Sequence, residues 1–470
     1  MNRRLTGFLV SIVATLATVA IVRPTASQQA AASRTHFSWK TTKLPAAKGH
    51  HKASFGEPTI VASAPDTLIV VAARANVGFP TMWVSRNDGV NWGRGKDFDK
   101  TGAMTGDDDV QVGADGFLYA LNLAFNNPPA EPTNPTVQVF RSRHWRKWHG
   151  PATFPSPHGQ DQPDRPWLVT DPSDPAHVWV FNSEGAGDVV VWNSDDHAHT
   201  FTGPASVTGA QQAGSIELTS RPLLDPSDSK KMSQIYEASA AGAPDIAVRD
   251  FPVTQLWLAR SEDGGATWTN SMIFDMAAAE GTGGSLGHIV PSSAIDADGN
   301  LYVVFSMRLD QETTTHVYLI HSTDDGVTWR APSRIDPKRL GSNVLPALAV
   351  GAPGKVDISW YGSRVADFTN DHARWVEMFA QSVDALSDHP SFVRGRISGR
   401  RPVHVGSINS AGNPGSNVYD WDLRDFQGIT LDRCGMAHVA WTDDRKRGKT
   451  FAARQIGGRP VITGSAGCNG

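Results

Sequence analysis

Short apolar runs recur along the chain in pairs, and Asp, Gly and Pro dominate the turn between the two runs of each pair. The first run of most pairs opens with an x-Pro-x-apolar phrase, and the second is a strand rich in Val, Trp, Tyr and Phe. The openings with proline are 57–60, 165–168, 221–224, 290–293 and 345–348, and those without it are 108–111 and 426–429. The returning strands are predicted at 68–73, 117–123, 177–182, 232–238, 301–307, 356–360 and 437–441.

This pattern predicts a repeat protein rather than one unique core. The seven units follow one another at spacings of about 50 to 80 residues, which fits propeller blades with loop insertions. A β-helix is disfavoured because its repeats are shorter and evenly spaced. We therefore predict an all-β fold, a β-propeller of seven four-stranded antiparallel blades, with six blades as the alternative.

A second repeat has the form S-x-D-x-G-x-T-W. It occurs at 261–268 and 322–329, with a partial match at 85–92 and a weaker match at 194–201. In a tight turn the Asp or Asn accepts backbone N–H groups, Gly supplies a positive φ, and Trp is an apolar plug. The positions assigned to this structural role are Ser85, Asn87, Trp92, Ser261, Asp263, Trp268, Ser322, Asp324 and Trp329.

These phrases resemble the Asp-box, or BNR, repeat of the sialidase superfamily of β-propellers. The resemblance implies that each box is structural and lies between the third and fourth strands of a blade, on the face away from the ligand. It does not extend to the sialidase catalytic residues. Glu57 opens the first blade where the resemblance implies an arginine, and Phe426 opens the last where it implies a tyrosine. The chain is more similar to exported bacterial BNR-repeat proteins.

Composition supports an all-β, turn-rich chain and excludes one class of partner. The 470 residues include 44 Gly, 30 Pro and 15 Trp, and the formal net charge is −4. Such a charge offers no basic field, so nucleic acid is not expected to bind.

The first residues have the features of a secretory signal peptide. Arg3 and Arg4 precede an apolar stretch over 5–22, and small residues follow at 24–27. We expect a cleaved signal at 1–27 rather than an uncleaved membrane anchor, a flexible tether at 28–54 and a single propeller domain at 55–470. The mature protein is expected to be a secreted monomer, extracellular or periplasmic, with no membrane partner after cleavage.

The chain has two cysteines, Cys434 and Cys468, both near its C-terminus. In an oxidising compartment they predict a disulfide that closes the last blade, with a catalytic thiol as the alternative. Two cysteines by themselves argue against a zinc site.

In a propeller whose first strands are innermost, the start of strand one and the end of strand two point to the same face. That geometry gathers scattered charged residues into one ring, which suits a carbohydrate or another anionic or polyhydroxylated ligand. The catalytic candidates are Glu57, Asp107, Asp164 and His288. The substrate-binding candidates are Arg165, Arg221, Arg74, Glu237, Arg308 and Asp425.

Two features of the ring have alternative interpretations. Arg165 and Arg221 occupy equivalent positions and could converge on one carboxylate or sulfate, or each could pair with an acid of the next blade. The run 107–109, with Asp161 and Asp164, could bind Ca²⁺ through oxygen ligands or be a solvated acidic loop. No other cofactor is required by the sequence.

Three functions remain open. A glycosidase would use Glu57 with Asp107 or Asp164, and a carboxylate separation of about 5 Å would imply retention. A polysaccharide lyase would neutralise a uronate with Arg165 and Arg221 and remove a proton with His288 or a tyrosine. The third is a non-catalytic ligand-binding propeller. The abundance of acids at the strand starts favours the glycosidase.

Overall fold

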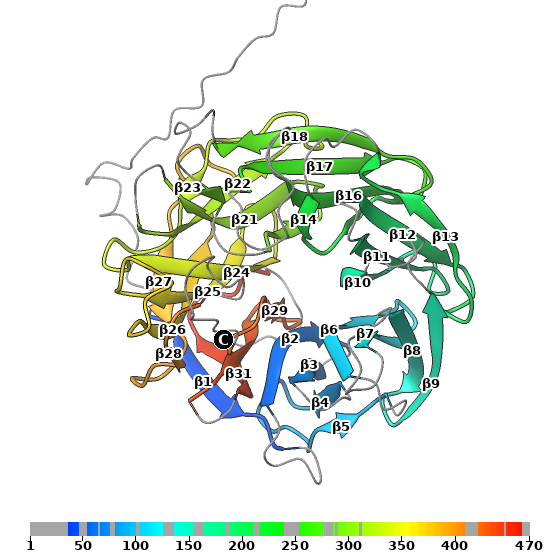
Figure 1. Cartoon of the computed structure of the whole chain (residues 1–470), viewed down its shortest axis with the longest axis horizontal. Coiled ribbons are helices and arrows are strands. Elements are labelled where there is room, and N and C mark those ends of the chain that lie inside the picture. Colours follow the sequence, from blue (N-terminus) through cyan, green and yellow to red (C-terminus); the bar gives the residue numbers. More distant parts are fainter. Residues whose placement is uncertain are drawn as a thin grey trace, which may run out of the picture.

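The computed structural model describes most of the chain beyond the N-terminal segment. The described residues are 36–46, 54–63, 66–75, 80–99, 104–125, 136–154, 163–184, 188–209, 216–238, 253–276, 278, 285–286, 290–309, 313–408, 422–445 and 448–462. Within them the strands form seven antiparallel sheets arranged as blades around a central axis (Figure 1). The predicted seven-bladed propeller is confirmed.

The first three blades each contain four strands in chain order, with the first strand innermost. Their strands are β2 (Ser54–Ala62), β3 (Leu68–Ala75), β4 (Thr81–Ser85) and β5 (Lys96–Asp97); β6 (Met104–Val112), β7 (Leu118–Phe125), β8 (Thr136–His144) and β9 (Lys147–Phe154); and β10 (Asp164–Thr170), β11 (Val178–Glu184), β12 (Asp188–Ser194) and β13 (Thr202–Ser206).

The fourth and fifth blades divide the innermost strand into two pieces, and the sixth adds a short outer strand. These blades comprise β14 (Ile216–Thr219), β15 (Leu223–Asp225), β16 (Asp228–Ala238), β17 (Gln255–Ser261) and β18 (Thr269–Asp275); β19 (Ser285–Leu286), β20 (Ser292–Ile295), β21 (Leu301–Arg308), β22 (His316–Ser322) and β23 (Ser333–Arg334); and β24 (Ser342–Val350), β25 (Val356–Ser363), β26 (Arg374–Ser382), β27 (Val393–Arg396) and β28 (His404–Val405).

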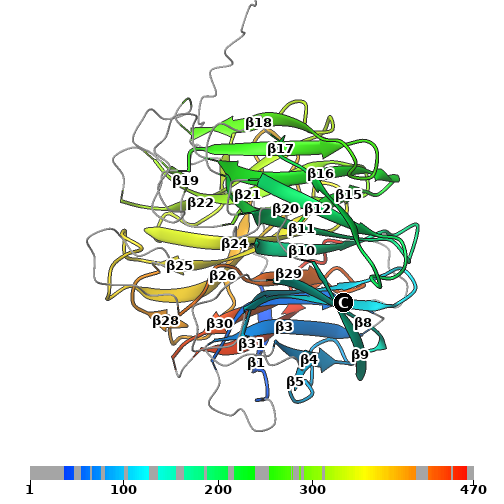
Figure 2. The same cartoon turned by 45° about the vertical axis from the view of Figure 1, so that its right-hand side comes forward.

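The seventh blade joins the two ends of the chain. It contains β29 (Gly428–Leu431), β30 (Ala437–Asp443) and β31 (Lys449–Gly457), and its outermost strand is β1 (Ser38–Lys43). β1 pairs antiparallel with β31, and Figures 1 and 2 both place the two strands side by side. The prediction that 28–54 is a tether is therefore wrong for β1. A single short strand of mostly polar residues gives too little pattern to recognise, although Trp39 packs edge-on against Phe379 at 4.8 Å.

The hydrophobic core lies mainly between neighbouring blades. One cluster, for example, joins Tyr302 and Leu319 of the fifth blade to Ile358, Trp360 and Met378 of the sixth. Both faces of each returning strand are buried by adjacent blades, so its residues form a nearly continuous apolar run. This run is the pattern from which the strand was predicted. All seven of these predicted strands are found in the structure.

The Ser-x-Asp phrases form turns between the third and fourth strands of their blades, where the resemblance placed them. Ser261 donates to Asp263 Oδ1 at 2.8 Å and accepts the N–H of Gly265 at 2.9 Å. Asp263 in turn accepts the N–H of Thr267 at 2.9 Å. Bonds from Thr267 and Ser261 lower the pKa of Asp263 to about 2. The turns at 85–92, 194–201 and 322–329 repeat this pattern.

A further turn of this kind was missed in the sequence. Ser382 donates to Asp384 Oδ1 at 2.9 Å after the third strand of the sixth blade, and Asp384 accepts the N–H of Ser391. The N–H donor lies seven positions after this Asp, instead of the usual four, so the phrase is unrecognisable in the sequence.

Cys434 is bonded in a disulfide. Its predicted partner Cys468 lies outside the described residues, so that pairing stays a prediction. Among the described residues no helix has the length and apolar character needed to cross a membrane.

Removing β1 should destabilise the whole ring, because the seventh blade loses its outer strand and the pairing of β1 with β31 that joins the two ends of the described chain. We expect a protein that starts at residue 44 to melt several degrees below one that starts at residue 36, as measured by calorimetry. Equal melting temperatures would contradict this role for β1.

Candidate functional site

The innermost strands share a local distortion near their starts. Glu57, Asp107 and Arg165 have φ angles of 53°, 50° and 48°, in the left-handed region that side chains disfavour. At each of these positions the pairing register with strand two shifts, so an extra residue is inserted as a β-bulge. The bulge removes the residue from the regular alternation and lets side chains of different blades meet at the axis. The bulge also shows that Asp107, rather than Asp108, is the structural equivalent of Glu57. The opening of the second blade, which was predicted at 108–111, therefore begins one residue earlier.

Five of the predicted site residues form one cluster there. Arg165 Nη1 lies 2.9 Å from Asp107 Oδ1 and 3.8 Å from Glu57 Oε1, and its Nη2 bonds to Asp425. The backbone N–H of Asp107 donates to Glu57 Oε2, and that of Arg165 donates to Asp164 Oδ1 at 3.0 Å. The cluster thus joins the first, second, third and seventh blades, and we call these five residues the axial cluster.

Burial controls the protonation of the axial cluster. Glu57 is 3% exposed, Asp107 7%, Arg165 4% and Asp425 1%. Burial and the nearby Asp425 raise the pKa of Glu57, against the opposing effect of Arg165. Burial also raises the pKa of Asp107 well above its usual range, and Glu57 and Asp164 add to the effect. One guanidinium cannot neutralise all these carboxylates, so the cluster retains protons that solvated carboxyl groups would lose.

A second ion pair lies beside the axial cluster. Both terminal nitrogens of Arg221 bond to Asp109 at 2.7 Å, and its guanidinium lies 5.0 Å from the centre of the Trp167 ring. Arg221 is partly exposed, whereas Asp109 is fully buried. Arg165 and Arg221 therefore each pair with acids, as the second interpretation has it, but Arg221 of the fourth blade bonds to Asp109 of the second blade and not to an acid of the next blade. Their role in binding substrate stays a prediction.

A cavity of about 400 Å³ extends along the innermost strands next to these pairs. Arg221 and Asp425 supply its charged groups, and Trp167 and Phe426 supply aromatic surface. The two rings lie 5.3 Å apart, and Val290 packs with them. Aromatic faces together with a few charged groups are the typical lining of a small-molecule site.

The sequence reasoning missed the role of two residues at the axis. Asp108 is fully buried, neither of its carboxyl oxygens has a hydrogen-bond partner among the described residues, and burial raises its pKa well above the usual range. Arg424 packs over Gly56, where any larger residue would collide with its side chain, and its charge lowers the pKa of Glu57. The sequence named Asp108 only as part of the run 107–109, and its burial and the position of Arg424 depend on ring closure, which no local pattern records.

The calcium site considered for 107–109 is not formed by the described residues. Asp107 bonds to Arg165, Asp109 bonds to Arg221, and Asp108 has no polar partner. Asp161 lies outside the described residues. Acidic groups that are already bonded to guanidinium groups in different directions do not converge on one cation.

The other predicted site residues lie elsewhere or cannot be placed. Arg74 is buried within its own blade, where it bonds to Asp97 at 2.6 Å and to Thr81, so it serves the blade rather than the axis. Glu237 is buried on β16, and Arg308 is half-buried at the end of β21. His288 lies outside the described residues.

One group of described residues has ligand atoms close enough to hold a metal ion: His404, Asp422 and Asp444, whose atoms lie within 4.8 Å of one another. His404 Nε2 lies 2.9 Å from the carbonyl oxygen of Ser407, and Nδ1 lies 2.6 Å from Asp444 Oδ2. Both ring nitrogens of His404 thus lie at hydrogen-bonding distance from an oxygen atom, one of which belongs to Asp444 of the same group.

Comparison with protein-family models and with curated proteins finds no match. Among solved structures, a lectin from Burkholderia pseudomallei has 12% sequence identity and a TM-score of 0.53, over 87% of this chain and 99% of the lectin. An ulvan lyase of family PL25 has 11% identity and a TM-score of 0.49, over 89% of this chain and 94% of the lyase. An α-L-arabinofuranosidase from Fusarium graminearum has 12% identity and a TM-score of 0.46, over 70% of this chain and 93% of the enzyme. At these identities the likeness to the lectin is one of fold.

Arg165→Met should destabilise the protein by about 3–5 kcal/mol at neutral pH, because it leaves buried carboxylates without their cation. Burial raises the folded pKa of Glu57 and Asp107, and loss of the guanidinium raises it further. Stability from such groups is present at low pH and is lost as pH rises through the folded pKa. The loss in free energy of unfolding caused by Arg165→Met should therefore be smallest near about pH 4 and grow toward neutrality, as measured by urea unfolding.

Arg330→Met is the matched control, because its pair with Asp388 is 3.1 Å long but largely exposed. That substitution should cost about 1 kcal/mol or less at either pH. A deficit for Arg165→Met that does not change with pH would contradict the assigned role of the axial carboxyl groups.

Proposed function

We propose that this protein is an exported glycoside hydrolase, in which Glu57 and Asp107 act as an acid and base pair on an extracellular glycan. The observation that carries the proposal is a pair of buried carboxyl groups from adjacent blades, joined through the N–H of Asp107 and both raised in pKa. Groups of this kind can hold a proton near neutral pH and donate it to a glycosidic oxygen.

We assign the roles within the pair from hydrogen bonding. The guanidinium of Arg165 lies 2.9 Å from Asp107 and 3.8 Å from Glu57, and its charge lowers the pKa of both groups against the effect of burial. Glu57 Oε1 has no hydrogen-bond partner in the described part of the chain and is the atom from which a proton would pass to the leaving oxygen. Asp107 would then act as the nucleophile or as the base that activates water, and Arg165 would act as a positioning residue.

The axial cavity supplies a place for a sugar. Trp167 offers an aromatic face, and Asp425 and Arg221 offer an acceptor and donors for hydroxyl groups. The fold-level likeness to a lectin is consistent with a saccharide ligand, although fold alone does not fix function. Export through the signal at 1–27 is part of the same proposal, since it would bring the protein to extracellular glycans.

A second candidate is a non-catalytic ligand-binding propeller. The observation in its favour is the burial of the axial cluster, in which Arg165 uses both terminal nitrogens on internal carboxylates. The lyase has less support, since Arg165 and Arg221, which would neutralise a uronate, are both paired internally. A screen of the purified protein against a panel of glycans separates the three functions. New reducing ends without unsaturation support the hydrolase, unsaturated products support the lyase, and binding without turnover supports the third.

Glu57→Gln should reduce hydrolysis of a responsive glycan by at least about a hundredfold, because the amide cannot donate the catalytic proton. Asp107→Asn should have a comparable effect, and both proteins should remain folded by circular dichroism. The control is Glu262→Gln, which changes an exposed carboxylate in a turn at the other end of a blade. Hydrolysis by Glu57→Gln at the rate of the unmodified protein would refute the assignment.

A further inference from the structure

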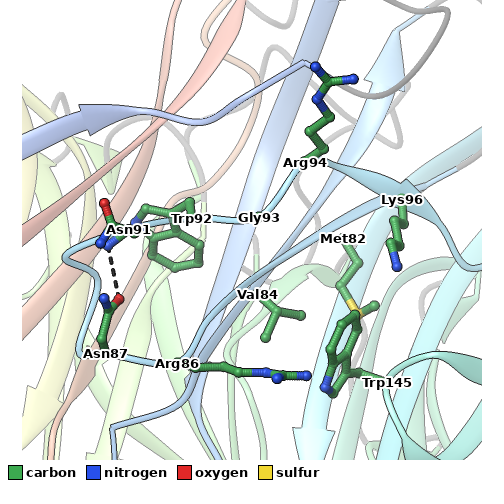
Figure 3. A pocket seen from close by; sticks show the side chains of 10 residues that line it. All are labelled: Met82, Val84, Arg86, Asn87, Asn91, Trp92, Gly93, Arg94, Lys96 and Trp145. Atoms are coloured by element: carbon green, nitrogen blue, oxygen red, sulfur yellow. Dashed lines mark hydrogen bonds between the residues drawn. The ribbon is translucent and has the colours of Figure 1, made fainter.

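A hollow of about 470 Å³ lies between the first and second blades, far along the strands from the axial cluster. It forms where the turn between β4 and β5 meets the turn between β8 and β9. Both turns join third and fourth strands, so antiparallel pairing places them at the end of the molecule opposite the starts of the innermost strands. Figure 3 shows Arg86 extended toward Trp145, with Lys96 close to the same indole.

The hollow has a strong positive charge in a chain whose net charge is −4. Arg86, Arg94 and Lys96 line it, and none of the described lining residues is acidic. Arg146 contributes a further cation from the edge, 5.0 Å from the centre of the Trp145 ring. All four cations are exposed, and no ion pair is found for any of them within the described part of the chain.

Other junctions between blades at this end of the molecule are neutralised. Arg330 of the fifth blade pairs with Asp388 of the sixth at 3.1 Å, and Arg433 of the seventh pairs with Asp66 of the first at 3.4 Å. Arg260 of the fourth blade also reaches Asp325 of the fifth at 3.9 Å. The junction of the first and second blades differs because cations gather there without a facing acid. Packing of the blades therefore does not require this arrangement.

The cations are held in place before any ligand arrives. Arg86 and Lys96 lie 4.6 and 4.8 Å from the centre of the Trp145 ring, at distances typical of cation–π contacts. Trp145 itself packs on the core between the two blades. The turn is fixed by the bond from the N–H of Asn91 to Asn87 Oδ1 at 2.9 Å. Such preorganisation lowers the entropy lost when an anion binds.

From this geometry we infer that the hollow is a binding site for an acidic saccharide unit, sulfated or carboxylated, within an anionic polysaccharide. Guanidinium groups match sulfate and carboxylate oxygens through paired hydrogen bonds. Trp92 offers indole surface in the same hollow, on which the C–H face of a sugar ring can pack. The volume lies within the range of small-ligand sites, roughly 300–1,000 Å³. A single hollow suits one acidic unit better than the continuous phosphate track of a nucleic acid.

This inference is independent of the proposed hydrolase, because the hollow shares no residue with the axial cluster or cavity. Binding is measured by isothermal titration calorimetry on the purified propeller. The probes are dextran sulfate, polygalacturonate and uncharged dextran, which distinguish sulfate from carboxylate and both from a neutral glycan. Binding of at least one charged polymer, no binding of dextran, and weaker binding at higher salt are expected.

The variant Arg86→Gln/Lys96→Gln should weaken binding of the charged polymer by about tenfold or more, since both cations contact it directly. Arg86→Lys keeps the charge but loses the planar guanidinium group that forms paired hydrogen bonds. It should therefore weaken binding less than the double variant but still measurably. Arg330→Gln/Lys230→Gln is the matched control, with the same change in charge at two exposed residues of the fifth and fourth blades, and should bind as the unmodified protein does. Trp145→Leu, checked for folding by its melting temperature, should also weaken binding.

Three results would overturn the inference. One is equal affinity of the Arg86→Gln/Lys96→Gln variant and the control variant. Another is equal binding of dextran and the charged polymers. The third is tighter binding of single-stranded DNA, or of vesicles containing phosphatidylglycerol, than of either charged polymer, which would assign the hollow to a different class of partner.

Discussion

The buried guanidinium of Arg165 is the interaction on which the centre of this propeller depends. It bonds to carboxylates from the second and seventh blades and lies near a third from the first blade. Without it these acids would repel one another in a region of low dielectric constant, where the cost of an unpaired charge is several kcal/mol. The carboxylates cannot move apart, because the bulges that aim them at the axis are fixed by the strand ladders on either side. Arg165 therefore connects the closure of the ring to the protonation of its candidate site.

The two ends of the propeller use charge differently. At the axis, acids outnumber the cations that contact them, and burial raises the pKa of those acids. At the junction of the first and second blades, exposed cations gather on one indole with no acid beside them. The first arrangement suits proton transfer in a dry site, and the second suits recognition of an anion in contact with water. A glycan-active protein with both would hold a polymer at one end and act on it at the other.

The sequence predicted the fold well because the evidence for it is local and repeated. A returning strand such as β21 is apolar along its length, since both faces are covered by neighbouring blades, and seven repeats of that pattern define a propeller. The turns at 261–268 and 322–329 were also readable, because their hydrogen bonds join residues only two to four positions apart. The sixth-blade turn at Ser382 escaped only because its loop is longer.

The site was predicted in part, and the reason for the limit is physical. The sequence alone determined that charged residues at strand starts share one face, and it therefore named Glu57, Asp107 and Arg165. Only the tertiary structure decided that Arg165 is bonded to Asp107 and Asp425, that Asp108 is buried without a polar partner, and that β1 closes the ring. These contacts join residues up to several hundred positions apart, and no local pattern records them. Their free energies depend on burial and on distances that arise when the seven blades close around the axis.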